Sequence, residues 1–571
     1  MSIIKLDVDN CQNCFKCIRE CPLKAIEFKD NRTKIIESEC VLCGTCMETC
    51  PRGAKYFRKN VEAVKELLRG DAPVCVSVAP SYTGWYNTNN FAPLSKALKK
   101  LGFYKAEETA IGAAQVAEEY VALMKSGHMK NIIATSCSSV VMLIEKHYPQ
   151  LLKMLAPVSS PMMAHARLMH EAYGDNVKVV FIGPCLSKMN EAQDPLAGGL
   201  VDEVITFDDL DSWLAAENIV IEEQDSDATG VQNPTARLYP KVQGILDTIG
   251  KRFYDYTPIS VDGIDRCMEI MESLQNGDIQ HLFIEANICH GACLGGPIMR
   301  MHNKNILKSQ IILSSEKSEI DSAVSKTAQI KLPHPRVFAN RSVDLKMPSE
   351  EEIHNILLKI GKTTPDKELN CGSCGYATCR EKAIAVYNGK ADIEMCLPYL
   401  RERAENMSST VIENSPNGIM TFDEDMNVTE INPKGEYLFG VTRAEIIGQM
   451  IPALYGETIF DDALESDKVV VKQCYGATES IIVELSVLYL KGHNQYIAFA
   501  KDISDTEENK KELTKLRLAT VDVAQSVIDK QMRVAQEIAS LLGETTAETK
   551  VALTALKKSI KDISNVQQLF E

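Results

Sequence analysis

Sixteen of the nineteen cysteines in this chain fall into three regularly spaced sets, and their spacing constrains the fold more than any other feature. The first set lies in two runs, CQNCFKCIRECP and CVLCGTCMETCP, and supplies Cys11, Cys14, Cys17, Cys21, Cys40, Cys43, Cys46 and Cys50. The second set is scattered and comprises Cys137, Cys185, Cys289 and Cys293. The third begins with CGSCGYATC and comprises Cys371, Cys374, Cys379 and Cys396. Thiols in groups of four are typical of metal or iron–sulfur ligation, so we expect a protein that moves electrons.

Composition narrows the possible partners and the compartment. A chain of 571 residues is too long for one core and should divide into roughly three to five domains. The net charge of −16 argues against nucleic acid or an anionic membrane surface as a partner. The start, MSIIKLDVDNCQNC, shows no secretory pattern, and no apolar run reaches the roughly 18 residues of a membrane helix. We therefore expect a cytoplasmic protein whose cysteines bind iron rather than form disulfides.

The first set has the spacing C-x2-C-x2-C-x3-C-P, twice, which resembles the bacterial two-cluster ferredoxins. In that signature the fourth cysteine of each run ligates the other cluster. The resemblance implies two 4Fe-4S clusters and an electron relay in residues 1–60. One cluster is expected on Cys11, Cys14, Cys17 and Cys50, and the other on Cys40, Cys43, Cys46 and Cys21. Zinc sites also use paired cysteines, but eight cysteines in this repeated order favour iron–sulfur clusters.

The second set lies in a region that alternates short apolar strands with amphipathic helices. Residues 74–80, 131–137 and 177–185 read as buried strands, and residues 118–127 read as a helix. This alternation predicts an α/β domain with a mostly parallel sheet. Cys137 and Cys185 end strands, where open α/β sheets place their ligands. We expect these two and the CHGAC pair to converge on one cluster buried between lobes.

Three motifs around these cysteines resemble the FeFe hydrogenases, whose loops read TSCCP, PCxxKxxE and ExxxCxxxCxxG. The corresponding segments here are ATSCSSV, GPCLSKMNE and EANICHGACLGG. The resemblance implies that Cys137, Cys185, Cys289 and Cys293 hold a 4Fe-4S cube. It further implies that Cys293 bridges this cube to a diiron unit with CO, cyanide and azadithiolate ligands, together called the H-cluster.

The resemblance also assigns roles to noncysteine residues. Lys188 is expected to hold a cyanide ligand by a charge-assisted hydrogen bond. Glu191 is expected to orient Lys188 or to lie on a water path. Ser136 stands where the family has a proton-relay cysteine. Together with Cys293, these are the predicted catalytic residues.

Several positions depart from the pattern of the fast enzymes. Gly183 and Asn287 stand where the family commonly has methionines that touch the diiron unit. The hydroxyl of Ser136 cannot accept and release a proton as the thiol of a cysteine can. We therefore predict slow turnover. Such departures occur in the branch of the family regarded as sensory, whereas related iron–sulfur assembly proteins keep the cysteines without the diiron unit.

The remaining chain divides into three segments. The third cysteine set resembles a small 4Fe-4S domain, although four cysteines suit zinc as well. Residues 403–505 resemble a PAS domain, which we expect to act by contact. The tail carries an apolar stripe with spacings of seven, four and three residues, which predicts a coiled coil. The stripe comprises Leu516, Val523, Val527, Val534, Ile538 and Leu541.

The sequence thus predicts a multidomain α/β protein with five parts: a ferredoxin-like module (1–60), a hydrogenase H-cluster domain (70–340), a 4Fe-4S domain (345–402), an α+β PAS domain (403–505) and a helical tail (506–571). We expect a hydrogenase of the ferredoxin hydrogenase class that converts H2 to protons and electrons and serves as an H2 or redox sensor. Its expected partners are ferredoxin or another redox protein, a signalling protein and a second copy of the chain. The alternatives are a ferredoxin-linked H2-evolving enzyme and an iron–sulfur scaffold or redox-signalling protein that lacks the diiron unit.

Overall fold

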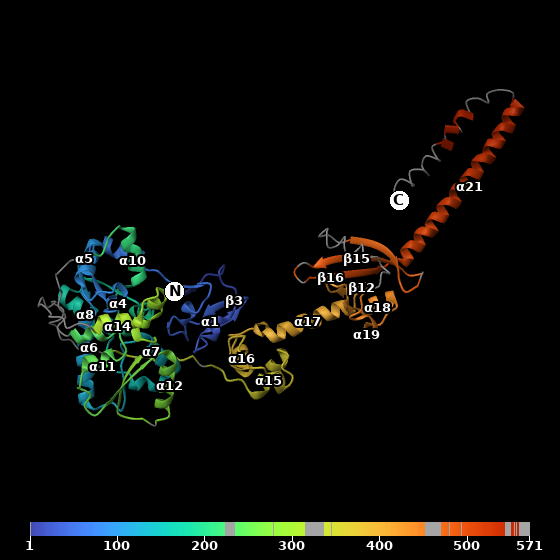
Figure 1. The fold of residues 1–571 in the computed structure, drawn as a ribbon. Helices are drawn as coiled ribbons and strands as arrows, with labels where there is room; N and C mark the ends of the chain where they lie inside the picture. The colour runs from blue at the N-terminus through green and yellow to red at the C-terminus, as the bar shows by residue number, and fades with distance from the viewer. Residues whose placement is uncertain are drawn as a thin grey trace. The chain divides into compact units, whose positions relative to one another are not determined.

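The computed structural model describes residues 2–222, 234–277, 279–314, 336–343, 345–450, 470–478, 480–490, 492, 494–542 and, with gaps, 550–558. The chain divides into two compact units, Met1–Leu400 and Arg401–Glu571 (Figure 1). In the part of the chain described, no helix combines the length and the apolar character that a membrane crossing requires.

The N-terminal module is built from two small antiparallel pairs and two single-turn helices. Strand β1 (Ile4–Leu6) pairs with β4 (Lys55–Phe57), and β2 (Ile26–Lys29) pairs with β3 (Arg32–Ile35). The helices α1 (Lys16–Arg19) and α2 (Thr45–Glu48) each follow a residue in the left-handed region, Phe15 and Gly44. This repeat places Cys17 and Cys46 at equivalent positions of the two halves.

The next region contains two parallel sheets, rather than the single mostly parallel sheet expected from the sequence. One sheet has the order β6-β5-β8-β9 and the other the order β10-β11-β7, and all their pairings are parallel. Their strands are β5 (Val74–Val78), β6 (Lys105–Glu108), β7 (Ile132–Ile133), β8 (Lys178–Gly183), β9 (Glu203–Thr206), β10 (Thr257–Asp262) and β11 (Leu282–Asn287). Of the predicted strand segments, 74–80 and 177–185 contain the buried strands β5 and β8, whereas within 131–137 only Ile132–Ile133 form a strand, β7.

Helices cover these sheets, and their ends follow local sequence signals. Helix α6 stops at Gly127, which adopts φ 66°, and α10 starts with a capping box between Thr206 and Asp209. The helices are α3 (Val61–Arg69), α4 (Tyr82–Tyr86), α5 (Ala92–Lys100), α6 (Ala110–Ser126), α7 (Ser138–His147), α8 (Pro161–Tyr173), α9 (Ser187–Gln193), α10 (Phe207–Ala216), α11 (Gly244–Ile249), α12 (Ile264–Gln275), α13 (Pro297–Met301) and α14 (Ile306–Ser314).

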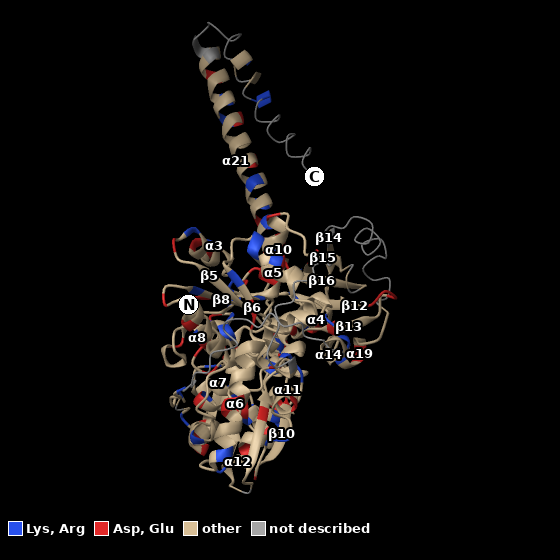
Figure 2. Cartoon of the chain, turned by 90° about the vertical axis from the view of Figure 1, so that its left-hand side faces the viewer, with Lys and Arg blue, Asp and Glu red and all other residues tan. Residues whose placement is uncertain are grey.

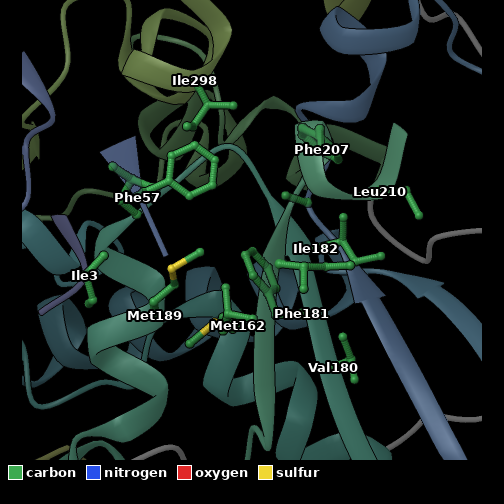
Figure 3. Packing of buried hydrophobic residues seen from close by; sticks show 14 of the residues in the cluster. Ile3, Phe57, Met162, Val180, Phe181, Ile182, Met189, Phe207, Leu210 and Ile298 are labelled. Carbon is green, nitrogen blue, oxygen red and sulfur yellow. The ribbon is translucent and has the colours of Figure 1, made fainter. Parts of the chain in front are cut away.

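The ferredoxin-like module and the first parallel sheet share one hydrophobic core. Figure 3 shows Phe181 and Ile182 of β8 near Met162 of α8, with Ile3 and Phe57 of the N-terminal module in the same cluster. Burying apolar side chains from both regions together stabilises their relative position. The predicted electron relay is therefore fixed against the predicted catalytic domain.

Residues 345–400 form a small helical module within the first unit. Its helices are α15 (Glu350–Lys359) and α16 (Cys379–Tyr387), and helix α17 (Leu397–Glu413) follows. Helix α16 thus begins at Cys379 and lies within the segment that leads to Cys396.

The second unit contains one antiparallel sheet with the order β13-β12-β16-β15-β14. The strands are β12 (Gly418–Phe422), β13 (Val428–Ile431), β14 (Val470–Tyr475), β15 (Ile482–Leu490) and β16 (Gln495–Asp502), with α18 (Pro433–Phe439) and α19 (Arg443–Ile446) between β13 and β14. This arrangement confirms the α+β fold expected for the PAS domain, and β14 is a strand that the sequence did not predict.

Helix α21 (Ser504–Leu542) is a single helix of 39 residues. Lys, Arg, Asp and Glu are interspersed along it (Figure 2). Apolar residues of the predicted stripe are exposed, with Leu516 65% and Val523 64% accessible. The helix is as expected, whereas the coiled coil remains a prediction.

Candidate functional site

The four cysteines of the second set line one pocket of about 390 Å³. Cys137 caps the start of α7 after β7, and Cys185 lies between β8 and α9. Cys289 follows β11, and Cys293 lies in the 3-10 turn Ala292–Gly295. Because β8 belongs to one sheet and β7 and β11 to the other, the pocket forms where the carboxyl ends of strands from both sheets meet.

The electrostatics of this pocket suit a cluster that brings its own positive charge. Burial raises the pKa of the Cys137, Cys289 and Cys293 thiols, and the neighbouring cysteines raise it further. Such thiols become thiolates only when a cation compensates the buried charge. Among the described residues no group of three or more His, Cys, Asp or Glu side chains is arranged to hold a single metal ion. A 4Fe-4S cluster would be bound through separate iron atoms, so its four thiolate ligands need not converge on one point.

Helix α9 places Lys188 and Glu191 three residues apart on one face beside the pocket. The Lys188 ammonium donates to Glu191 Oε2 at 2.6 Å and to the Ser136 carbonyl at 3.1 Å. Glu191 also accepts from Ser138 Oγ at 2.6 Å and from Arg336 Nη1 at 2.5 Å. Of the two roles expected for Glu191, the geometry matches that of a group that orients Lys188.

Charge keeps Glu191 ionised although it is fully buried. Burial by itself raises the pKa of Glu191, yet the Lys188 ammonium and the Arg336 guanidinium outweigh it and hold the pKa at about 2. Sequence reasoning missed Arg336, which lies 145 residues further along the chain and belongs to no motif. Lys188 is itself only 9% exposed, so its ammonium is held in place from several sides.

Ser136 does not stand alone in the structure. Its hydroxyl lies 3.3 Å from Tyr120 Oη, and this phenol oxygen accepts from the Thr135 N–H at 2.9 Å. Tyr120 is fully buried in α6. The hydroxyls of Ser136 and Tyr120 can therefore pass a proton between them, but neither is a strong base at neutral pH.

A buried carboxyl next to this region was not singled out from the sequence. Glu285 of β11 accepts from the N–H groups of Ile245 and Leu246 at 3.0 and 3.1 Å and from Asn287 Nδ2 at 3.2 Å. Burial raises the pKa of Glu285 to about 7. The signal that could have found it is an acidic residue inside the apolar run HLFIEANIC.

Two positions that depart from the family pattern are explained by their surroundings. A Cβ on Gly183 would lie 2.7 Å from the Phe181 ring and 3.1 Å from Ala79 Cβ, so Phe181 fills the space a larger side chain would need. Asn287 lines the pocket and donates to Glu285. Both positions are thus integrated into their local packing.

The structure brings the ferredoxin-like cysteines together in the two groups that the spacing predicts. Cys17 lies close enough to Cys11, Cys14 and Cys50 for their charges to act on it. Cys46 likewise lies close enough to Cys43, Cys40 and Cys21 for their charges to act on it. Cys43 in turn acts on Cys289, and Leu42 lines the pocket of the second set. The second group is therefore the one next to the candidate catalytic pocket.

The third set also lines a single pocket, of about 360 Å³. All four of its cysteines contribute, together with two lysines that the sequence did not single out, Lys362 and Lys382. Burial lowers the pKa of Lys382, while Cys396 and Cys374 favour its charged form. The donor set suits a cluster with four thiolate ligands.

The arrangement defines a class: a multidomain iron–sulfur protein with an α/β domain that holds a cysteine pocket between two parallel sheets. Residues 72–258 and 252–297 match the family model "Iron only hydrogenase large subunit, C-terminal domain". Residues 10–54 match a 4Fe-4S dicluster domain, residues 368–398 a putative Fe-S cluster domain, and residues 406–508 the PAS fold. The α/β domain of this chain is therefore similar to the iron-only hydrogenase large subunit over residues 72–297.

Individual proteins are more distant. Iron hydrogenase 1 of Clostridium pasteurianum is 23% identical over 297 residues, and the match spans about half of that protein, 52%, and 42% of this chain. A solved FeFe-hydrogenase of Chlamydomonas reinhardtii is 17% identical and is covered completely by 50% of this chain, with a TM-score of 0.39. The PAS domain of an HTR-like protein of Haloarcula marismortui is 24% identical, with 98% of it and 18% of this chain covered and a TM-score of 0.16.

Proposed function

We propose that this chain is an FeFe hydrogenase that converts H2 reversibly into two protons and two electrons and uses this chemistry to sense H2 or redox state. One observation carries the proposal: four thiols line one pocket, and beside them the Lys188 ammonium, whose charge acts on Cys137 and Cys293, is fixed by a buried carboxylate. An iron–sulfur scaffold needs the thiols alone. The Lys188–Glu191–Arg336 network adds a fixed ammonium donor, which suits a pocket that also holds an anionic group to be oriented.

The residues divide the work of holding such a group. Cys137, Cys185, Cys289 and Cys293 would hold a 4Fe-4S cube, and Cys293 would also bind the diiron unit of an H-cluster, which supplies the H2-splitting chemistry when bound. Lys188 would donate to a cyanide ligand, because its ammonium lies near Cys137 and Cys293 and acts on both. Glu191 accepts a hydrogen bond from the Lys188 ammonium and so fixes its direction.

The rate of proton delivery distinguishes a sensory hydrogenase from a fast H2-evolving hydrogenase. Ser136 and Tyr120 form a hydroxyl pair that relays a proton only when a donor and an acceptor are present at its two ends. Because this relay contains no titratable thiol, we expect slow turnover both in H2 oxidation and in proton reduction. The ferredoxin-linked H2-evolving enzyme, the catalytic alternative, would require a fast path.

Domain order supports the sensory role. The cysteine sites precede a PAS fold and a long helix with exposed apolar residues, and no further enzymatic domain is evident in the described part of the second unit. We propose that ferredoxin or another redox protein exchanges electrons with the relay and that a signalling protein or a second copy of the chain binds the second unit. This part fails if reduction by H2 changes neither the conformation of residues 400–571 nor their affinity for the partner.

Infrared spectroscopy tests the catalytic proposal directly. Protein matured with the diiron unit should show CO and cyanide bands in a region where protein does not absorb, and Cys293→Ser should abolish them. Lys188→Met should shift the cyanide bands more than the CO bands, because the ammonium is proposed to contact cyanide. Absence of all bands after maturation would overturn the proposal in favour of the scaffold, and high turnover would favour the H2-evolving alternative.

A further inference from the structure

The helical module with the third cysteine set is docked on the ferredoxin-like module. Arg19 of α1 donates from Nε and Nη2 to the carbonyls of Gly372 and Ser373, at 3.3 and 3.2 Å. On the other side of the contact, Lys390 forms a largely buried ion pair with Glu39 at 2.6 Å. Charged groups buried in pairs fix the orientation of two surfaces, so the two modules meet in one defined arrangement.

Lys24 lies at the centre of this contact. Its ammonium donates to the carbonyls of Ile18 and Arg19 at 3.1 and 3.0 Å, and to the carbonyl of Gly375 in the other module at 2.9 Å. The charges of Cys21 and Cys374 both act on Lys24. One of these cysteines belongs to the second ferredoxin group and the other to the third set, so the lysine connects the two cysteine sites.

The backbones approach closely at the same place. Gly375 has φ +95°, and a Cβ there would lie 2.8 Å from Ile18 Cγ2. A side chain at this position would push the modules apart and lengthen the path between the two sites. The glycine of CGSCGYATC that follows the second cysteine is therefore needed for proximity as well as for its backbone conformation.

The third pocket is also lined by two buried lysines. Lys382 is 1% exposed and donates to the Ile393 carbonyl at 2.9 Å, and Lys362 is 7% exposed. Both line the pocket with the four cysteines. A cluster gains one negative charge when it is reduced, so fixed positive charge nearby favours the reduced form.

We propose that the third cysteine site is the electron-accepting end of the relay and is filled from the second ferredoxin site across the contact made by Lys24. In this step one electron leaves the cluster on Cys40, Cys43, Cys46 and Cys21 and one electron enters the cluster on Cys371, Cys374, Cys379 and Cys396. No bond forms or breaks and no proton moves. The inference depends on the clusters and not on H2 chemistry, so it goes beyond the proposed function.

The place of Cys396 gives this end of the relay a route to the second unit. Cys396 immediately precedes α17, and its carbonyl accepts a hydrogen bond from the Leu400 N–H at 2.9 Å. The charge on the third cluster would therefore change next to the first residue of α17, a helix that runs from Leu397 to Glu413.

An anaerobic redox titration of the full-length protein, followed by electron paramagnetic resonance, tests the proposal. Dithionite serves as the reductant and the diiron unit is omitted, so the result is independent of whether the chain turns over H2. The third cluster, identified by loss of its signal in Cys371→Ser, should be reduced before the two ferredoxin clusters. Lys382→Met should disfavour its reduction by about tenfold, which is about 59 mV for a one-electron couple.

Matched variants separate charge from folding. Lys382→Arg should retain the reduction potential of the third cluster. Lys34 pairs with Glu27 on the surface of the ferredoxin-like module and is 79% exposed, so Lys34→Met should leave the potential of every cluster unchanged. If Lys382→Met fails to bind the cluster, Lys362→Met replaces it with the same expectation. Loss of the third cluster should also narrow the signal of the second ferredoxin cluster, because neighbouring reduced clusters broaden each other.

Three results would overturn the proposal. They are reduction of the third cluster after the ferredoxin clusters, an unchanged potential in the lysine variants, and a second-cluster signal that does not respond to Cys371→Ser.

Discussion

Replacing Glu285 with glutamine is expected to remove a pH dependence of stability that comes from this one carboxyl. Glu285 lies in the middle of the buried strand β11, and its acceptor bonds come from two backbone N–H groups and one amide. Glutamine has nearly the same shape and keeps one oxygen to accept the bonds from Ile245 and Leu246, and it loses only the bond from Asn287 Nδ2. The variant therefore changes charge far more than packing.

The magnitude follows from the shift in pKa. The pKa of Glu285 is raised from the usual 4.5 to about 7, so the folded protein holds a proton there that the unfolded chain has released. This favourable contribution is fully present below pH 4.5 and is lost as the pH rises through 7. At about 1.4 kcal/mol per pH unit, the unmodified protein should lose about 3 kcal/mol between these limits, and Glu285→Gln should not.

Tryptophan emission during denaturation with urea provides the assay. The chain has two tryptophans, Trp85 and Trp213, and both lie in the α/β domain, so the signal reports on the domain that contains Glu285. Other groups titrate as well, and the difference between variant and unmodified protein at each pH cancels them. Glu118→Gln serves as the control, because this carboxylate is 52% exposed in its pair with Arg252.

From pH 5 to pH 8, the unfolding free energy of the unmodified protein should fall by about 3 kcal/mol relative to that of Glu285→Gln. In infrared difference spectra, the unmodified protein should show a protonated carboxyl band that titrates near pH 7 and is missing from the variant. Parallel pH profiles of the two proteins, together with no such band, would refute the reasoning.

Two further changes test the site. Ser136→Cys should raise hydrogenase turnover in both directions, because a thiol can accept and release a proton where the serine hydroxyl only passes one on; unchanged activity in matured protein would show that this position does not limit the rate. Glu191→Gln should lower the unfolding free energy at pH 7 by about 3 kcal/mol or more, because it leaves Lys188 and Arg336 buried beside a neutral group, while the exposed control Glu118→Gln should change it by less than about 0.5 kcal/mol. An equal effect of the two substitutions would contradict the assignment of Glu191 as the anion of this network.

Local signals in the sequence predicted much of the fold. The apolar runs around β5 and β8 identified buried strands because their residues are mostly β-branched or aliphatic over a length suited to a strand. The division into two parallel sheets was missed, because strand order depends on contacts between residues far apart in the chain. Strand β14 was missed for a related reason: its pairing with β15 is set by the tertiary fold of the PAS domain.

The cysteine sites also divide into features that local sequence predicts and features that only the tertiary structure shows. Spacing within CQNCFKCIRECP or CGSCGYATC is a local property that a single loop must satisfy in order to wrap a cluster, so it can be read directly. The partners of the candidate site residues are not local: Arg336 binds Glu191 across 145 residues, and no motif surrounds Arg336 in the sequence. The surroundings of Glu285 are likewise assembled from β11 and the start of α11.

The sequence by itself determined which thiols form sets, which family the α/β domain resembles, and that a PAS fold and a long helix follow. Only the tertiary structure decided how these sites relate: that the second ferredoxin group adjoins the pocket of the second cysteine set, and that Lys24 joins this group to the third set. The physical reason is that ligand spacing is encoded over a few residues, whereas burial, charge and the distance between sites arise only when distant segments pack together.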